Sequence, residues 1–126
     1  MSSPFEIDTD ASGVHTTILR ARGVLDARSA PVLTHRCAEV RTQERHLVLN
    51  LSGVTFIASS GVGSLLALVE EFRNSSSRIR LAEVSPAILS VVKLLNLDSF
   101  LHLSPSEAEA VQQLEAEGEE RRRRAA

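Results

Sequence analysis

The first residues of the chain alternate apolar and polar side chains with a period of two, which is typical of an exposed or edge strand. Residues 5–8 show this alternation, and residues 14–19 are rich in Val, Thr and Ile and predict a second strand. Residues 10–13 lie between the two and predict a hairpin loop. Residues 23–26 (Gly-Val-Leu-Asp) end this part of the sheet. The chain is therefore expected to open with an antiparallel pair of strands.

Four later segments place apolar residues three, four and seven positions apart, which is the spacing of one face of an α-helix. The second of these helices is expected to begin near Ser59, and the third follows residues 85–86 (Ser-Pro), a cap with Pro at the first helical position. Residues 104–107 (Ser-Pro-Ser-Glu) match the capping-box pattern of a fourth helix, which we expect to end near Gly118. The predicted apolar stripes are Ala30, Leu33, Cys37 and Val40; Val62, Leu65, Leu66, Val69 and Phe72; Ile88, Val91, Val92 and Leu95; and Ala108, Val111 and Leu114.

The segments between the helices predict further strands. Residues 46–51 are almost continuously apolar, as in a central strand, and residues 54–57 are extended again after a turn at residues 52–53. Residues 78–84 predict another strand and residues 101–103 a short edge strand. Alternating strands and helices indicate a largely parallel sheet with right-handed crossovers. We therefore expect an α/β fold, with a mixed, mostly parallel sheet of four to five strands and about four helices.

Composition restricts the function more than it identifies it. A length of 126 residues fits one domain, since domains hold roughly 100–200 residues. The aromatic content of 3% comes from four Phe, with no Trp or Tyr, which argues against a base-stacking platform or an aromatic cage. Cys37 is the single cysteine, so no internal disulfide is expected, and its place on a helical stripe predicts a buried structural thiol.

Charge is distributed unevenly along the chain. Residues 1–118 hold 10 basic and 14 acidic side chains, and this acidic body argues against direct nucleic-acid binding. We expect the domain to span residues 4–116 and residues 117–126 to form a disordered, Arg-rich tail. The run of four arginines, Arg121 to Arg124, is read as a solvated tail, with contact to an acidic partner or nucleic acid as the alternative.

Targeting segments and metal ligands are not expected. The first four residues lack the basic and apolar regions of a secretory signal, and no apolar run approaches the length of a membrane span. The sequence therefore predicts a cytoplasmic protein without membrane insertion. The four histidines, His15, His35, His46 and His102, do not have metal-ligand spacing, so neither a metal nor a cofactor is expected.

The most informative segment is the polar turn between the central strand and the second helix. It places Ser59 and Ser60 at a helix N-terminus, where free N–H groups and a partial positive charge favour an oxygen acceptor or a phosphate. Gly61 and Gly63 remove side chains from the first turn, so another protein backbone is able to approach closely. The alternative is structural: Ser59 serves as an N-cap, and Asp26 as the cap of the first helix.

Two motifs in this arrangement resemble a known family. Residues 56–66 (Phe-Ile-Ala-Ser-Ser-Gly-Val-Gly-Ser-Leu-Leu) resemble the signature of STAS domains, the sulphate transporter and anti-sigma factor antagonist domains. Residues 23–26 resemble the Gly-x-Leu-Asp sequence that opens the first helix of that family. The resemblance covers about residues 4–115, and it implies the STAS fold.

The resemblance implies a regulator that switches partners and is not an enzyme. Such an antagonist binds an anti-sigma factor that is also a serine kinase and thereby frees the sigma factor. Phosphorylation of the first serine ends binding, and a serine phosphatase restores it. By position, the phosphoacceptor is Ser59, with Ser60 less favoured, and Asp26 lies close to it. The implied partner-binding residues are Asp26, Ala58, Ser59, Ser60, Gly61, Gly63 and Ser64.

One position departs from the family pattern. The residue before the serine pair is usually Asp and is Ala58 here. This difference supports an alternative in which the domain is a STAS scaffold without phosphorylation, or a soluble subunit of a signalling or transport assembly. A third reading, a small hydrolase or nucleotide enzyme, has no identifiable nucleophile–base pair and no Lys-Ser/Thr after the glycines to complete a phosphate loop.

Overall fold

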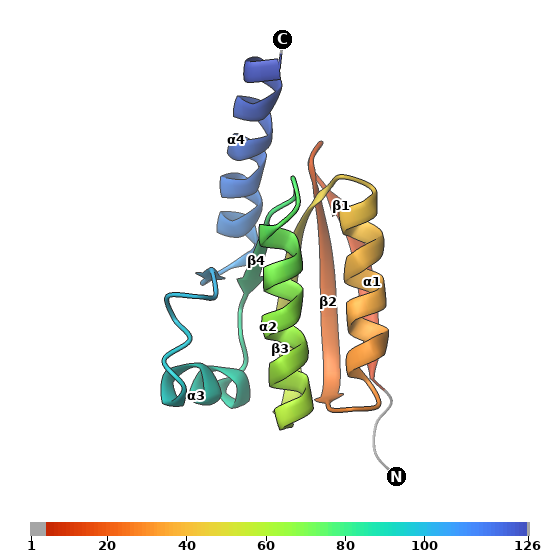
Figure 1. Cartoon of the computed structure of the whole chain (residues 1–126), viewed down its shortest axis with the longest axis vertical. Coiled ribbons are helices and arrows are strands. Elements are labelled where there is room, and N and C mark those ends of the chain that lie inside the picture. Colours follow the sequence, from red (N-terminus) through yellow and green to blue (C-terminus); the bar gives the residue numbers. More distant parts are fainter. Residues whose placement is uncertain (1–4, 126) are drawn as a thin grey trace.

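An opening hairpin is followed by alternating helices and strands, as the apolar pattern predicts (Figure 1). The computed structural model describes residues 5–125. Pro4 and Ala126, which begin the predicted domain and end the predicted tail, lie outside this range. The elements are β1 (Glu6–Ser12), β2 (Thr16–Leu25), α1 (Ala30–Thr42), β3 (His46–Ile57), α2 (Ser59–Arg73), β4 (Ile79–Ala82), α3 (Pro86–Leu94), β5 (Leu103–Ser104) and α4 (Glu107–Ala125).

The five strands form one sheet in the order β1-β2-β3-β4-β5, which is also their order in the chain. β1 pairs with β2 in the antiparallel direction, and the other three pairs are parallel. Parallel neighbours require a crossover connection, and α1, α2 and α3 lie in these connections. The predicted α/β fold with a mixed, mostly parallel sheet is confirmed, with five strands and four helices among residues 5–125.

Side chains alternate between the two faces of the sheet and so divide the core into two parts. Leu19 and Leu49 belong to the larger cluster, which includes the buried residues of α1 and α2. Ile18 and Val48 are their neighbours along the same strands and pack with Leu114 of α4. As a result, α1 and α2 cover one face of the sheet, where Figure 1 shows them side by side, and α4 covers part of the other.

The predicted helical stripes are confirmed completely in α1 and partly in the other helices. All four predicted α1 residues are buried, and so are most of the residues predicted for α2 and α3. Four predicted residues are only half-buried: Val62, Leu66, Val91 and Val111. Leu95 is exposed, Leu68 joins the core, and α4 buries Ala110 in place of Ala108.

Several strand predictions differ from the structure. β1 extends to Ser12, so the hairpin loop comprises residues 13–15 and not residues 10–13. The expected turn at residues 52–53 is wrong, because β3 continues through it as one strand. Arg20 pairs with Asn50 and Arg22 with Gly53, so β3 contains one extra residue at this point, a β-bulge. The short edge strand is also displaced, since β5 comprises residues 103–104 and not residues 101–103.

The capping box predicted for the fourth helix is wrong. α4 begins at Glu107, two residues later than predicted, and the Ser106 hydroxyl accepts a hydrogen bond from the Glu109 N–H at 3.2 Å. Ser106 is therefore the capping serine, and the side chain of Glu107 is directed to the sheet. The buried face of α4 contains Ala110, Leu114 and Gly118, and Ala108 lies outside it and is exposed.

The predicted end of this helix near Gly118 is also wrong, because residues 117–125 are helical. Gly118 is buried against the His15 ring, and a Cβ atom at position 118 would lie 2.6 Å from it. One turn earlier, the Glu115 carboxylate accepts hydrogen bonds from the Val14 and His15 N–H groups at 2.8 and 2.9 Å. The turn between β1 and β2 therefore holds α4 at the point where the sequence suggested that it would stop.

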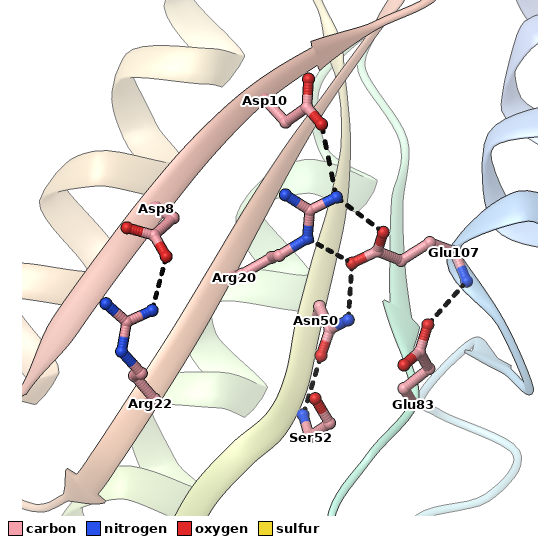
Figure 2. Close-up of polar contacts among 8 residues, drawn as sticks. All are labelled: Asp8, Asp10, Arg20, Arg22, Asn50, Ser52, Glu83 and Glu107. Carbon is pink, nitrogen blue, oxygen red and sulfur yellow. Dashed lines mark hydrogen bonds and ion pairs between the residues drawn. The ribbon is translucent and has the colours of Figure 1, made fainter.

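The start of α4 is held by a polar network that crosses the sheet (Figure 2). Arg20 donates two hydrogen bonds to the Glu107 carboxylate, each 2.8 Å long, and the buried Asn50 amide donates a third at 2.6 Å. The Asn50 carbonyl accepts from the Ser52 N–H at 2.8 Å. The Arg20 guanidinium lowers the pKa of Glu107 more than burial raises it, so the carboxylate stays charged.

Candidate functional site

Ser59 and Ser60 are the first two residues of α2, and both side chains are exposed. The chain reaches them directly from β3, whose last residue is Ile57. Ala58 has the extended backbone of an N-cap residue, with φ −88° and ψ 168°. The N-cap reading of Ser59 is therefore wrong: Ser59 lies one position inside the helix, and its hydroxyl does not cap the helix.

The N-terminus of α2 has no side-chain cap. Ala58 lacks an acceptor atom, and its carbonyl accepts the first helical hydrogen bond, from the Val62 N–H at 3.0 Å. The earlier N–H groups of a helix have no partner within the helix and carry the positive end of its dipole. The segment thus presents two hydroxyls at a helix end that favours negative charge, without a carboxylate already placed there.

The two glycines of this turn have different roles. Gly61 is buried, and a Cβ atom there would lie 2.6 Å from the Leu25 carbonyl oxygen and 3.0 Å from an Ile57 side-chain carbon. The close backbone approach expected at Gly61 is therefore made by the chain's own β2, and not by a second protein. Gly63 is exposed and has no atom within 4 Å of a Cβ position, so this side of α2 is open. Ser64 is half-buried.

Asp26 lies at the same end of the sheet as Ser59, as the sequence predicts. It follows the last residue of β2, and that residue, Leu25, pairs with Ile57 at the end of β3. The Leu25 carbonyl also accepts a hydrogen bond from the Ala58 N–H at 2.9 Å. The loop that contains Asp26 is thus fixed directly to the start of α2.

The carboxylate of Asp26 caps the turn that leads into α1. It accepts hydrogen bonds from the N–H groups of Ser29 and Arg28, at 3.1 and 3.0 Å. The Ser29 N–H bond is the main cause of a lowered pKa at Asp26. The Ser29 hydroxyl donates to the Val24 carbonyl at 2.6 Å and does not cap the helix. The helix-cap reading of Asp26 is therefore wrong: its charged carboxylate closes the turn before α1, and α1 has no side-chain cap.

The structure adds an exposed aromatic ring and an aliphatic groove that the sequence did not reveal. Phe56 is 57% exposed and pairs with Val24 across the strands, beside the bulged part of β3. A narrow groove between α2 and α3 is lined only by aliphatic side chains, among them Ile57, Val62 and Leu66. Phe56 pairs with Val24, whose side chain points away from the face that Leu25 and α2 occupy. Phe56 is therefore exposed on the opposite face of the sheet, where α4 packs near Ile18 and Val48. The aliphatic groove lies on the α2 side, beside the helix that begins with the two serines.

Other chemistry is not found among the described residues. No group of three or more His, Cys, Asp or Glu side chains in residues 5–125 could hold a metal ion. Cys37 is buried, and burial raises the pKa of its thiol to about 12, which fits the predicted structural thiol. None of the helices in this range has the length and apolar content that a membrane span needs.

Comparison with known proteins agrees with this architecture. Residues 6–110 match the sequence profile of the family described as STAS domain. An anti-sigma F factor antagonist from Paenibacillus polymyxa is 25% identical over 100 residues, which cover 78% of this chain and 86% of that protein.

Solved structures show the same fold at lower identity. An anti-sigma factor antagonist from Mycobacterium paratuberculosis superposes with a TM-score of 0.77 at 23% identity, covering 90% of this chain and 98% of the other. The phosphorylated form of the Bacillus cell fate determinant SpoIIAA gives a TM-score of 0.66 at 22% identity, covering 86% and 98%. At these identities the likeness to solved structures establishes the fold alone.

Proposed function

Because the chain belongs to the STAS domain family, we propose that it is an anti-sigma factor antagonist controlled by serine phosphorylation. In this role it binds an anti-sigma factor with serine kinase activity, and the sigma factor is released. One observation carries the proposal: the exposed hydroxyl of Ser59 stands at the uncapped N-terminus of α2. A relative at 25% identity is an anti-sigma F factor antagonist, which supports the same assignment.

A phosphate on Ser59 would change the surface without disturbing the fold. It would add about −1.5 to −2 charges at neutral pH. The N-terminus of a helix stabilises such a charge by roughly 0.3–1 kcal/mol, and no carboxylate occupies that position here. Folding therefore tolerates the modification. A partner that covers the exposed start of α2 would have to bury the new dianion, which is strongly unfavourable.

The proposed docking surface combines exposed residues of the turn with the neighbouring apolar positions. Ser59, Ser60 and Gly63 are exposed at the start of α2, and the aliphatic groove between α2 and α3 supplies neighbouring apolar positions that a partner can cover. Asp26 contributes through its loop, which is joined to the start of α2 by the Leu25 carbonyl. The chain itself supplies only the phosphoacceptor, and the kinase and a serine phosphatase are separate proteins.

Ser59→Asp is expected to weaken binding to the anti-sigma factor at least about tenfold, or about 1.4 kcal/mol, because it places a permanent charge at the interface. The measurement is the affinity of the purified chain for each anti-sigma kinase of its own organism. Ser60→Asp adds the same charge one residue further along α2 and is the matched control, with a smaller expected effect. Intact mass spectrometry should locate a single phosphate on Ser59 after incubation with kinase and ATP. Equal affinity of Ser59→Asp and the unchanged chain would refute the switch.

A second candidate function follows from Ala58. Without the usual carboxylate before the serine pair, the domain could act as a constitutive binding scaffold or as a soluble subunit of a signalling or transport assembly. The fold and the docking surface stay the same in this alternative, and Ser59 serves only as a surface residue.

Ala58→Asp separates the two candidates and also tests the structure. An acceptor at the N-cap should raise the free energy of unfolding by about 1 kcal/mol, since α2 has no side-chain cap. Urea denaturation measures this gain, and Ala58→Asn is the control that caps the helix without adding charge. If only Ala58→Asp is phosphorylated rapidly, the switch has been lost in this chain. Efficient phosphorylation of the unchanged chain would instead favour the antagonist.

A further inference from the structure

A cationic cleft lies at the C-terminal end of α2, opposite the end that carries Ser59. It has a volume of about 140 Å³ and is formed by α2, the start of β4, the segment before β5 and α4. Since α2 contains 15 residues, the cleft lies about 22 Å along the helix from Ser59, at about 1.5 Å per residue. Its polar lining residues are Arg73, Ser77, Arg78, Arg80, His102 and Glu117.

The cleft lies beside a part of the sheet where β4 lacks a strand partner on one side. β5 pairs only with Leu81 and Ala82, so the beginning of β4 has no strand partner on this side. Val69, Phe72 and Ile79, which also line the cleft, are buried, and they give it an apolar floor. Charges that stand over such a surface interact more strongly than in bulk water. The unpaired start of β4 therefore lies beside a cleft in which the arginine side chains attract an anion more strongly than they would in bulk water.

A buried hydroxyl without a partner lies in this cleft. Ser77 is 1% exposed, and its Oγ makes no hydrogen bond within the described part of the chain. Nearly all buried hydroxyls in proteins are hydrogen-bonded, so this atom requires an explanation. The Oε2 atom of Glu117, in the same cleft, is also buried without a hydrogen bond. The Ser77 hydroxyl is a donor that a polar group from outside the chain can use, whereas the Glu117 oxygen would have to move away from an anion.

Two guanidinium groups pair with one carboxylate in the cleft, and a third guanidinium lines it. Arg80 pairs with Glu117 at 3.1 Å, and Arg78 lies 4.0 Å from the second carboxylate oxygen. The Arg73 guanidinium lies 4.5 Å from the centre of the Phe100 ring and 3.6 Å from Glu70, which lies outside the cleft. Arginine donors in a fixed fork match the oxygens of phosphate and carboxylate groups. The excess positive charge, already partly matched by the Glu117 carboxylate, favours an anion with several oxygens.

The pKa of His102 is lowered in the same positively charged environment. Burial lowers the pKa of its imidazole, and the neighbouring Arg80 and Arg73 charges lower it further. A neutral imidazole keeps one donor and one acceptor nitrogen for a bound group. An anion placed between the arginines would reverse their effect on this ring and raise the pKa of His102. The pKa of His102 therefore reports whether an anion is bound in the cleft.

We propose that this cleft binds a small tetrahedral oxyanion, either inorganic phosphate or the phosphate group of a small monoester. Arg73, Arg78 and Arg80 supply charge, the Ser77 hydroxyl donates to one oxygen, and the Glu117 carboxylate is displaced. The volume of about 140 Å³ is below the roughly 300–1,000 Å³ that encloses a drug-sized ligand, so a whole nucleotide does not fit inside. The site is separate from the proposed Ser59 switch and does not depend on it.

The test is a titration of the full chain followed by the NMR signals of the backbone amides and of the His102 ring. Inorganic phosphate should give saturable shifts at residues 77–80 and should raise the pKa of His102, with sodium chloride at equal ionic strength as reference. Glycerol phosphate forms the second arm. Tighter binding of glycerol phosphate identifies a monoester site, and tighter binding of inorganic phosphate identifies a site for the free ion.

Variants make the assignment specific. Arg78→Gln and Arg80→Gln should each weaken phosphate binding about tenfold, because each removes a charged donor. Lys93→Gln removes one positive charge from an exposed position of α3 and is the matched control, with no expected effect on phosphate binding. Glu117→Gln should strengthen binding, since the competing carboxylate is lost. Arg78 is exposed, so its variant remains informative if Arg80→Gln fails to fold.

Ser77→Ala provides a result that a purely structural serine would not give. Removing a buried hydroxyl that lacks a partner should raise the melting temperature of the free chain, while phosphate affinity falls severalfold. The proposal is overturned if phosphate causes no saturable shift in either the unchanged chain or Glu117→Gln. It is also overturned if the arginine variants bind phosphate as tightly as Lys93→Gln.

Discussion

Gly61→Ala is expected to lower the free energy of unfolding by about 2–3 kcal/mol, in the range of forced overpacking. The added Cβ atom would lie 2.6 Å from the Leu25 carbonyl oxygen, a distance at which one of the two backbones must move. The Leu25 carbonyl already accepts a hydrogen bond from the Ala58 N–H, and the Leu25 side chain is fully buried. The backbone of β2 at Leu25 is therefore not free to shift. The loss outweighs the gain in helix propensity, which is at most about 1 kcal/mol for Gly to Ala.

Gly63→Ala is the matched control for this prediction. It makes the same chemical change in the same helix, where the new atom would have no neighbour within 4 Å. We expect this variant to be as stable as the unchanged chain or more stable, by up to about 1 kcal/mol. Urea denaturation of the three proteins measures the difference. Equal stability of the two variants would contradict the tight contact between α2 and β2.

Glu107→Ala is expected to lower the free energy of unfolding by about 2 kcal/mol at neutral pH. The larger part comes from the buried Asn50 amide, which would lose its acceptor. The ion pair with Arg20 adds less, because the Arg20 side chain is 40% exposed and water screens the interaction. Glu109→Ala is the matched control, since it removes the same charge from the exposed side of the same helical turn.

The effect of Glu107→Ala should depend on pH in a definite direction. The pKa of Glu107 is lowered in the folded chain relative to its ordinary value of 4.5. A carboxylate with a lowered pKa stabilises the fold fully above its unfolded pKa, and this contribution is lost as pH falls below it. The stability difference between the unchanged chain and Glu107→Ala should therefore shrink below about pH 4.5. A difference that stays constant from neutral to acid pH would argue against the charged network.

The sequence predicted correctly those features that depend on residues close together in the chain. The α1 stripe from Ala30 to Val40 was correct at every position, because helical spacing and burial on one face are encoded within a few turns. The places of Ser59 and Asp26 at one end of the sheet also followed, since the ends of parallel neighbouring strands meet there.

The contacts that the sequence did not reveal join residues far apart in the chain. Glu107 was read as a capping residue, whereas its partner Arg20 is 87 positions away. Asn50 was the available signal, because a polar residue within an apolar central strand requires a buried hydrogen-bond partner. The sequence also did not predict that α4 continues beyond Gly118. The His15 ring that packs against this turn is far from it in the sequence.

The cleft and the exposed side chain of Phe56 were missed for a related reason. The cleft collects arginines from α2 and β4 and a histidine from the segment before β5, with no motif shared among them. Phe56 is exposed because α4 packs on the part of its sheet face near Ile18 and Val48 and leaves Phe56 uncovered. Both features depend on tertiary arrangement, which short-range periodicity does not encode.

The order of the strands in the sheet has a consequence for how the chain assembles during synthesis. Each strand pairs with the one made just before it, so every pairing is available as soon as the next strand leaves the ribosome. Contacts of short sequence separation also favour rapid folding. The last element, α4, returns to the first hairpin from the far end of the sequence, through Glu115 and Glu107. We expect the sheet to form progressively and the last helix to complete the cooperative unit.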